Sequence, residues 1–176
     1  MSALFEAGIS LMKYVADPYS KLPAITFWLM GSLAAVVPSS LPLLVIPLVI
    51  GLIPLILLKW RINLLSLPDE EALAMGINIT RMRIIVIVCA TLITSSIVAV
   101  GGLIGWVGLI IPHMARIVAG PDFRKLLPAS LLMGSTFLLL VDDIARGATS
   151  MEIPLGILTA AVGAPFFLIL MYRSQR

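Results

Sequence analysis

Residues 84–115 read IIVIVCATLITSSIVAVGGLIGWVGLIIPHMA, a stretch without a charged side chain. A helix of this length would measure roughly 48 Å at about 1.5 Å per residue, whereas the hydrocarbon core of a bilayer is about 30 Å thick. The stretch therefore predicts one full membrane span and a short return helix, turned by the glycines between Gly101 and Gly108. Irregular backbone within a membrane is tolerated only where protein or water surrounds it, so we expect other helices to line the return helix.

The composition of the whole chain supports a membrane protein. Of its 176 residues, 60% are apolar and 12% are charged, against roughly 45–50% and about 25% in soluble domains. The net charge of +3 would suit a nucleic-acid-binding protein, but the basic residues flank apolar runs, where Lys and Arg set membrane topology. We therefore expect no nucleic-acid partner. The single cysteine, Cys89, lies inside an apolar run and predicts neither a disulfide within the chain nor a thiol metal site.

Charged residues and helix breakers divide the chain into a predicted all-α, polytopic membrane helix bundle. We expect about five membrane-crossing helices, one of them short, together with an interfacial helix and a cytoplasmic coupling helix. These segments belong to one transmembrane domain over residues 1–176. They are the tail of a helix at 2–16, an external interfacial helix at 23–35, spans at 41–58, 84–100, 108–119 (short), 126–145 and 154–172, and a cytoplasmic coupling loop at 60–83.

The basic residues predict the orientation of these segments. Two crossings between residues 84 and 115 place nine of the twelve Lys and Arg residues on one side of the membrane, which the positive-inside rule identifies as the cytoplasm. These nine are Lys59, Arg61, Arg81, Arg83, Arg116, Arg124, Lys125, Arg173 and Arg176. The charged residues of the predicted external loops are Lys13, Asp17, Lys21, Asp142, Asp143, Arg146 and Glu152.

The coupling loop contains a short helix with clear boundaries. Residues 67–76 read LPDEEALAMG, with proline near the helix start, acids in the first turn and glycine at the stop. Local physics fits a simple connector and a docking helix equally well. Glu71 and Ala72, followed by Gly76, resemble the Glu-Ala-x-x-x-Gly loop of ATP-binding-cassette (ABC) importer permeases, which docks on the ATPase subunit. The residues that this resemblance implies in ATPase coupling are Pro68, Glu70, Glu71, Ala72 and Gly76.

Residues 105–128 carry the longest motif, GWVGLIIPHMARIVAGPDFRKLLP. The run is similar to the signature of FecCD-type permeases, which take up iron-siderophore, haem and cobalamin complexes, although that family often has His where Phe123 stands. His113 is the only histidine, and one imidazole without a neighbouring ligand predicts no metal site. A packing role beside Pro112 is favoured over a proton-carrying one. The signature residues are Gly105, Gly108, Pro112, His113, Arg116, Gly120, Asp122 and Arg124.

A third segment contains DDIAR at 142–146 and EIPLGILTA at 152–160, and it resembles the C-terminal part of the same family. The adjacent carboxylates Asp142 and Asp143 would point about 100° apart on a helix, so they cannot share one proton around a substrate. The resemblance implies that Arg146 meets a carboxylate of a substrate-binding protein, and an i,i+4 pair with Asp142 is an equally open interpretation. The small or helix-bending residues expected to allow close packing of the last span are Gly156, Gly163 and Pro165.

Together these motifs cover nearly the whole chain, and they match the family from the end of the fifth of its usual ten spans onward. The resemblance implies the C-terminal half of a permease in the cell (inner or plasma) membrane, truncated or completed by another chain. Implied partners are ABC ATPase subunits, an extracytoplasmic substrate-binding protein, membrane lipid and a second permease copy. No cofactor is implied for this chain, since ATP belongs to the partner subunit. The alternatives are a membrane-embedded enzyme using His113 with Asp142, and a non-transporting remnant.

Overall fold

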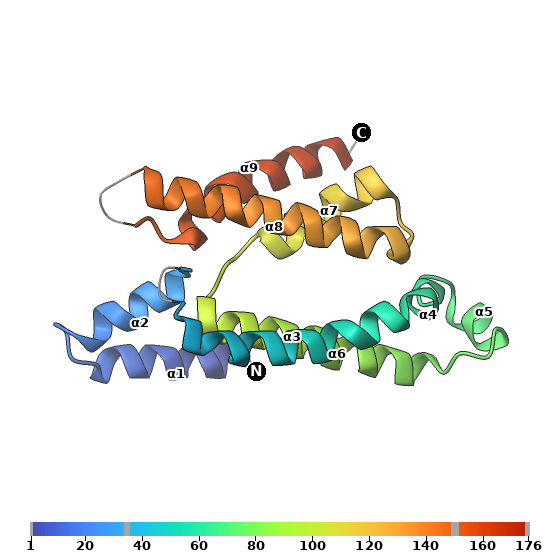
Figure 1. Ribbon diagram of the computed structural model, residues 1–176, viewed down its shortest axis with the longest axis horizontal. Helices are drawn as coiled ribbons and strands as arrows, with labels where there is room; N and C mark the ends of the chain where they lie inside the picture. The colour runs from blue at the N-terminus through green and yellow to red at the C-terminus, as the bar shows by residue number, and fades with distance from the viewer. Residues whose placement is uncertain (1, 34–35, 149–151, 175–176) are drawn as a thin grey trace.

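The computed structural model describes residues 2–33, 36–148 and 152–174, and every regular element in these ranges is a helix (Figure 1). The predicted all-α fold is therefore confirmed. In chain order the helices are α1 (Ser2–Val15), α2 (Lys21–Met30), the 3-10 helix η1 (Pro38–Ser40), α3 (Leu41–Leu57), α4 (Lys59–Leu64), α5 (Asp69–Ala74), α6 (Ile79–Gly101), α7 (Val107–Ala119), α8 (Phe123–Gly147) and α9 (Leu155–Ser174). Residues 34–35 of the predicted interfacial helix, Arg176 and the side chain of Arg173 lie outside the described part of the chain.

Three helical segments of the described chain are long and apolar enough to cross a membrane: η1 with α3, α6, and α8. α7 and the Leu155–Leu168 part of α9 are shorter apolar helices. Many large hydrophobic side chains of these helices point outward, among them Leu132, which is 70% exposed, and Ile87, which is 63% exposed. Apolar surface of this extent needs lipid or other helices around it rather than water. The chain is therefore a multi-pass membrane protein.

The helices form two groups that run side by side in Figure 1. α3 and α6 pack against each other in opposite directions, while α7, α8 and α9 contact one another in the second group. α4 contacts α8 at one end of the bundle, and α2 contacts α9 at the other. We call the end that carries α4 and α5 the α5 end, and the end where α8 finishes the Arg146 end.

The uncharged stretch at 84–115 divides into a long and a short helix. α6 stops at Gly101, Gly102 turns the chain with a φ of 71°, and α7 begins at Val107 and runs toward the α5 end (Figure 1). α7 packs on α8 and α9, as a short helix within a membrane requires. Trp106 precedes α7 with a φ of 65°, the single positive φ at a non-glycine residue among those described.

Side-chain caps set the beginnings of the two longest helices. The side chain of Asn78 accepts a hydrogen bond from the backbone N–H of Arg81 at 3.0 Å and starts α6. Asp122 starts α8 in the same way, through the backbone N–H of Arg124 at 3.0 Å. Both helices therefore begin before the predicted spans, whose limits were drawn at charged residues and helix breakers.

The ends of the bundle differ in charge. The described basic residues at the α5 end are Lys59, Arg61, Arg81, Arg83, Arg116, Arg124 and Lys125. Lys13, Lys21 and Arg146 lie at the opposite end (Figure 1). The predicted grouping of basic residues is thus reproduced in space for the described part of the chain, while the compartment that each end faces stays a prediction.

Candidate coupling and docking surfaces

The residues predicted to couple to an ATPase lie on and around α5. Pro68 precedes the helix with a φ of −52° and a ψ of 143°. Gly76 follows it with a φ of 78°, and its N–H donates to the carbonyl oxygen of Leu73 at 2.9 Å. The next N–H, of Ile77, donates to the carbonyl oxygen of Ala72 at 3.3 Å. These two bonds form a Schellman motif, whose left-handed residue favours glycine.

α5 has one buried and one exposed side. Ala72 is only 1% exposed, because α5 packs on the start of α6. Glu70 and Glu71 are exposed in the first turn, and Leu73 beside them is 59% exposed. The exposed side therefore combines negative charge with an apolar side chain at its flank.

A small core and an ion pair hold α5 to its neighbours. Leu64, Ile77 and Met82 are buried against one another between α4 and α6. A carboxylate oxygen of Asp69 lies 2.8 Å from a guanidinium nitrogen of Arg83, with both side chains more than half exposed. An exposed pair of this kind contributes roughly 0.2–1 kcal/mol. Its main consequence is to orient the first turn of α5 relative to α6.

α4 forms the first part of the predicted coupling loop and connects it to the signature motif. The side-chain N–H of Asn63 donates to the carboxylate of Asp122, and the side-chain oxygen of Asn63 accepts from the backbone N–H of Phe123 at 2.7 Å. The pKa of Asp122 is lowered, mainly by the hydrogen bond from the backbone N–H of Arg124 and next by the one from the side chain of Asn63. The turn between α7 and α8 is thus fastened to the coupling loop by a two-way amide contact.

Other signature residues pack α7 onto α9. The rings of Trp106 and Phe167 have centroids 6.3 Å apart at an interplanar angle of 66°, and those of His113 and Phe166 are 6.4 Å apart at 71°. Both are edge-to-face arrangements, which stabilise aromatic pairs. A Cβ atom added at Gly163 would lie 2.6 Å from the Cβ atom of Trp106. The glycine therefore permits this approach, and the ring contact supports a packing role for His113.

The remaining signature residues lie at turns or on the surface. Gly120 ends α7 with a φ of 82°, and its N–H donates to the carbonyl oxygen of Arg116 at 3.0 Å. A Cβ atom added at Gly105 or Gly108 would meet no atom within 4 Å, so packing among the described residues requires neither glycine. The exposed members of the predicted set are Gly105, Gly108, Pro112, Arg116, Arg124 and Pro165.

At the opposite end, Arg146 contacts two carboxylates. Its Nε lies 2.9 Å from Oδ2 of Asp142 and 3.7 Å from Oε1 of Glu152. The other oxygen of Glu152 accepts a hydrogen bond from the hydroxyl of Ser32 at 3.5 Å. The i,i+4 pair with Asp142 is therefore present. The side chain of Arg146 is nevertheless 50% exposed, so this arrangement also leaves a surface for a partner.

Backbones approach one another closely beside Arg146. The glycine junction, which we define by Gly31, Gly102 and Gly156, joins α2, the α6–α7 connection and α9. The backbone N–H of Leu155 donates to the carbonyl oxygen of Gly31 at 2.9 Å. A Cβ atom added at Gly156 would lie 2.5 Å from the carbonyl oxygen of Met30. A side chain at any of these three positions would therefore collide with the backbone of a neighbouring segment.

His113 and Asp142 belong to separate sets of contacts. His113 packs on the ring of Phe166, whereas Asp142 faces Arg146. Within residues 2–33, 36–148 and 152–174, no three His, Cys, Asp or Glu side chains form a group that could hold a metal ion. Nothing in this arrangement combines the two residues into a catalytic site.

Known proteins resemble this chain over its entire length. It is 44% identical over 176 residues to the molybdate import system permease protein MolB of Haemophilus influenzae. It is 45% identical over 175 residues to a Helicobacter pylori protein named "Probable iron chelatin transport system permease protein". The alignments cover 100% and 99% of this chain but 52% and 53% of the relatives. The chain therefore spans about half the length of the curated relatives that it matches.

A solved structure has the same fold. It is described as an inward-facing conformation of a transporter assigned to the metal-chelate ABC type, and it matches with a TM-score of 0.92 and 45% sequence identity. The match covers 98% of this chain and 56% of the other. These relatives give no support to the enzyme alternative. The family model of the FecCD transport family matches residues 1–173, and the chain belongs to that family.

Proposed function

We propose that this chain forms the C-terminal half of the permease subunit of an ABC importer for a metal-containing substrate. The observation that carries the proposal is the placement of two different surfaces at opposite ends of one bundle. The acidic α5 lies at the end that is rich in basic residues, and Arg146 lies at the other. In a cell membrane, the first surface would meet an ATPase subunit in the cytoplasm, and the second an extracytoplasmic binding protein.

Coupling to the ATPase would depend on α5. Glu70 and Glu71 offer charge to a partner groove, and the exposed Leu73, one turn after Glu70, offers an apolar anchor beside it. Because Ala72 is buried, force on α5 passes into the bundle rather than bending a free loop. The contact between Asn63 and Asp122 would carry the same displacement to α7 and α8. ATP is bound and hydrolysed by the partner, and we assign no cofactor to this chain.

Docking of the binding protein would use the Arg146 end. Asp142 and Glu152 hold the guanidinium from one side through Nε, which orders the side chain before a partner arrives and lowers the entropic cost of docking. A carboxylate of the binding protein would then pair with the exposed part of Arg146. A second permease copy would complete the substrate path between the two protomers.

The substrate is defined only by its chemical class. The family resemblance points to iron-siderophore, haem or cobalamin complexes, and one relative carries the name of a molybdate permease. These ligands share a metal centre but differ in size and charge. We therefore propose a metal-containing substrate that a separate binding protein selects.

The proposal is tested by Glu71→Arg in the complete permease that contains this sequence, reconstituted with its ATPase and binding protein. We expect ATP hydrolysis to continue while uptake falls by at least about tenfold, equivalent to about 1.4 kcal/mol of lost coupling. Glu71→Gln keeps the shape without adding a positive charge and should retain more uptake. Gly76→Val should act like Glu71→Arg, because a β-branched residue disfavours the φ of 78° while its Cβ atom would meet no atom within 4 Å. Normal uptake by Glu71→Arg and Gly76→Val would exclude the docking assignment.

A further inference from the structure

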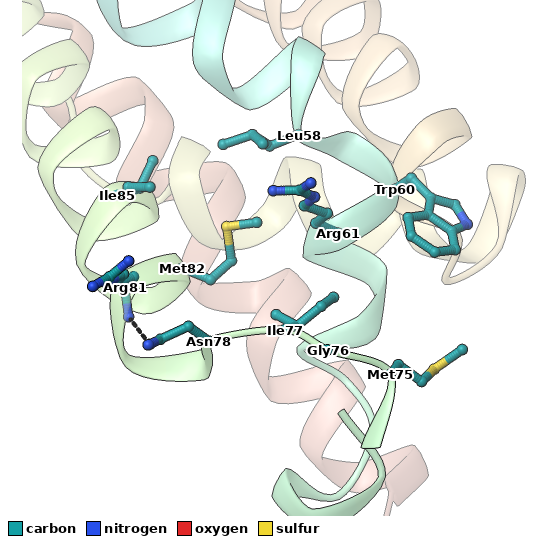
Figure 2. Close-up of a pocket in the computed structure, with 10 residues that line it drawn as sticks. All are labelled: Leu58, Trp60, Arg61, Met75, Gly76, Ile77, Asn78, Arg81, Met82 and Ile85. Carbon is teal, nitrogen blue, oxygen red and sulfur yellow. Dashed lines mark hydrogen bonds between the residues drawn. The ribbon is translucent and has the colours of Figure 1, made fainter. Parts of the chain in front are cut away.

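A hollow of about 360 Å³ lies where the end of α3, α4 and the first turns of α6 meet (Figure 2). We call it the basic pocket. The residues that line it include Leu58, Trp60, Arg61, Asn78, Arg81 and Ile85. Of the residues predicted to couple to an ATPase, Gly76 alone reaches its lining, so the pocket is distinct from the exposed side of α5.

Two arginines give the pocket its charge. Arg61 belongs to α4 and Arg81 to the first turns of α6, so two arginines from different helices line the pocket (Figure 2). No ion pair to either guanidinium is formed by the described residues, whereas the neighbouring Arg83 is paired with Asp69 at 2.8 Å. The pocket lining contains no acidic side chain. Two arginines without an acidic partner in the lining of one hollow therefore favour an anion, and the planar donor groups of arginine suit phosphate oxygens.

The other wall of the basic pocket is apolar and continuous with the spans. Leu58 directly follows α3, and Ile85 belongs to the apolar run of α6 and is 38% exposed. Trp60 is 50% exposed, and tryptophan is enriched where membranes meet water. A ligand that contacts all these residues must be anionic at one end and apolar at the other. A phosphate ion satisfies only the first condition.

We propose that the basic pocket binds the phosphodiester headgroup of an anionic phospholipid between Arg61 and Arg81, with an acyl chain along Leu58 and Ile85. In the orientation that the positive-inside rule predicts, the pocket lies in the cytoplasmic leaflet, where anionic lipids attract basic segments. Such a lipid would hold α4 against α6 next to the Schellman turn that ends α5. The proposal goes beyond the transport function, because lipid binding here requires neither ATP nor substrate.

The test uses quenching of Trp60 fluorescence by brominated lipids in the complete permease, reconstituted in phosphatidylcholine nanodiscs. Brominated phosphatidylglycerol or brominated phosphatidylcholine is added at the same low mole fraction. The signal of Trp60 is obtained by subtracting a Trp60→Phe variant. We expect preferential quenching by phosphatidylglycerol, and a loss of about fivefold in that preference for each of Arg61→Gln and Arg81→Gln.

Matched controls separate a site from general attraction to anionic lipid. Arg116→Gln removes the same charge at the same end of the bundle from a residue outside the pocket, and it should leave the preference nearly unchanged. Arg61→Lys retains the charge and should retain most of the preference, even if a glutamine variant folds poorly. Circular dichroism of each variant checks its helix content.

Three outcomes would overturn the proposal. Equal quenching by the two lipids would show that the pocket has no headgroup preference. An equal loss in Arg116→Gln would show that the preference is a property of the whole surface. Displacement of the lipid signal by millimolar inorganic phosphate or by the ATPase partner would show that a soluble anion or an acidic protein segment occupies the pocket instead.

Discussion

Asn63 of α4 and Asp122 of the α7–α8 turn are joined by a side-chain hydrogen bond, although 59 residues separate them in the sequence. Asp122 also caps α8, and Asn63 accepts the N–H of Phe123. One amide thus connects the coupling loop with the first turn of a predicted span. Through this contact, a movement of α4 would be passed to the start of α8.

Replacing Asn63 by alanine should loosen this link. The backbone N–H of Phe123 loses its acceptor, which costs about 1 kcal/mol of folding free energy, and uptake by the assembled importer should fall more than ATP hydrolysis does. Thermal unfolding and the ratio of uptake to ATP hydrolysis measure the two effects. The control is Ser66→Ala, which removes an exposed hydroxyl that donates to the backbone carbonyl oxygen of Asn63 at 2.6 Å and leaves both side-chain contacts of Asn63 in place. A parallel decrease of uptake and hydrolysis would assign Asn63 to folding alone.

The lowered pKa of Asp122 predicts a pH-dependent contribution to stability. Because the folded state favours the carboxylate, this contribution is complete above the ordinary pKa of 3.8 and is lost as the pH falls through the lower folded value. Asp122→Asn keeps a capping side chain but lacks the charge. Wild type should therefore exceed Asp122→Asn in unfolding temperature at pH 6, with a smaller difference below pH 3.8. Asp17 also has a lowered pKa, but it is common to both proteins. A constant difference across this range would contradict the prediction.

Alanine at Gly156 should destabilise the bundle. The added methyl group would lie 2.5 Å from the carbonyl oxygen of Met30, and overpacking of this kind costs about 1–3 kcal/mol. Gly108→Ala is the matched control, because it lies in α7 with no atom within 4 Å of the added methyl group. It should raise helix stability by up to about 1 kcal/mol. We expect the unfolding temperature to fall for Gly156→Ala and to rise for Gly108→Ala. Similar shifts for both variants would refute the close approach of Gly156 to Met30.

Cysteines at positions 71 and 146 should be labelled from opposite sides of the membrane. Both Glu71 and Arg146 are exposed, and they lie at different ends of the bundle. The native Cys89 is buried and can be changed to serine in the background. A membrane-impermeant maleimide added to intact cells should react with Arg146→Cys, whereas Glu71→Cys should react only after permeabilisation. Labelling of both from the same side would refute the predicted topology.

Two kinds of sequence signal predicted the fold. Long apolar runs indicated the spans, and glycines indicated where helices end and the chain turns. The glycines after residue 100 located the break between α6 and α7, and Gly76 located the end of α5. The exact helix starts required capping contacts at Asn78 and Asp122, which apolar runs do not report.

The contacts within the candidate surfaces were less accessible. Asn63 belongs to no motif that the sequence reveals, and its partner Asp122 lies in a distant motif. The proximity of Gly31 to α9 depends on how α2 returns to the bundle, which no local pattern encodes. Arg146 was predicted to meet a carboxylate of a binding protein or to pair with Asp142, and its contact with Glu152, a residue beyond the end of α8, was not predicted.

The glycine junction has a mechanical consequence. Because α2 and α9 contact each other through main-chain atoms there, neither helix can tilt at that end without moving the other. The junction would then act as a pivot. A small displacement at the α5 end would become a rotation of the helices about this nearly fixed point. If the bundle opened at one end, α2 would accordingly tilt with α9 and would not slide along it.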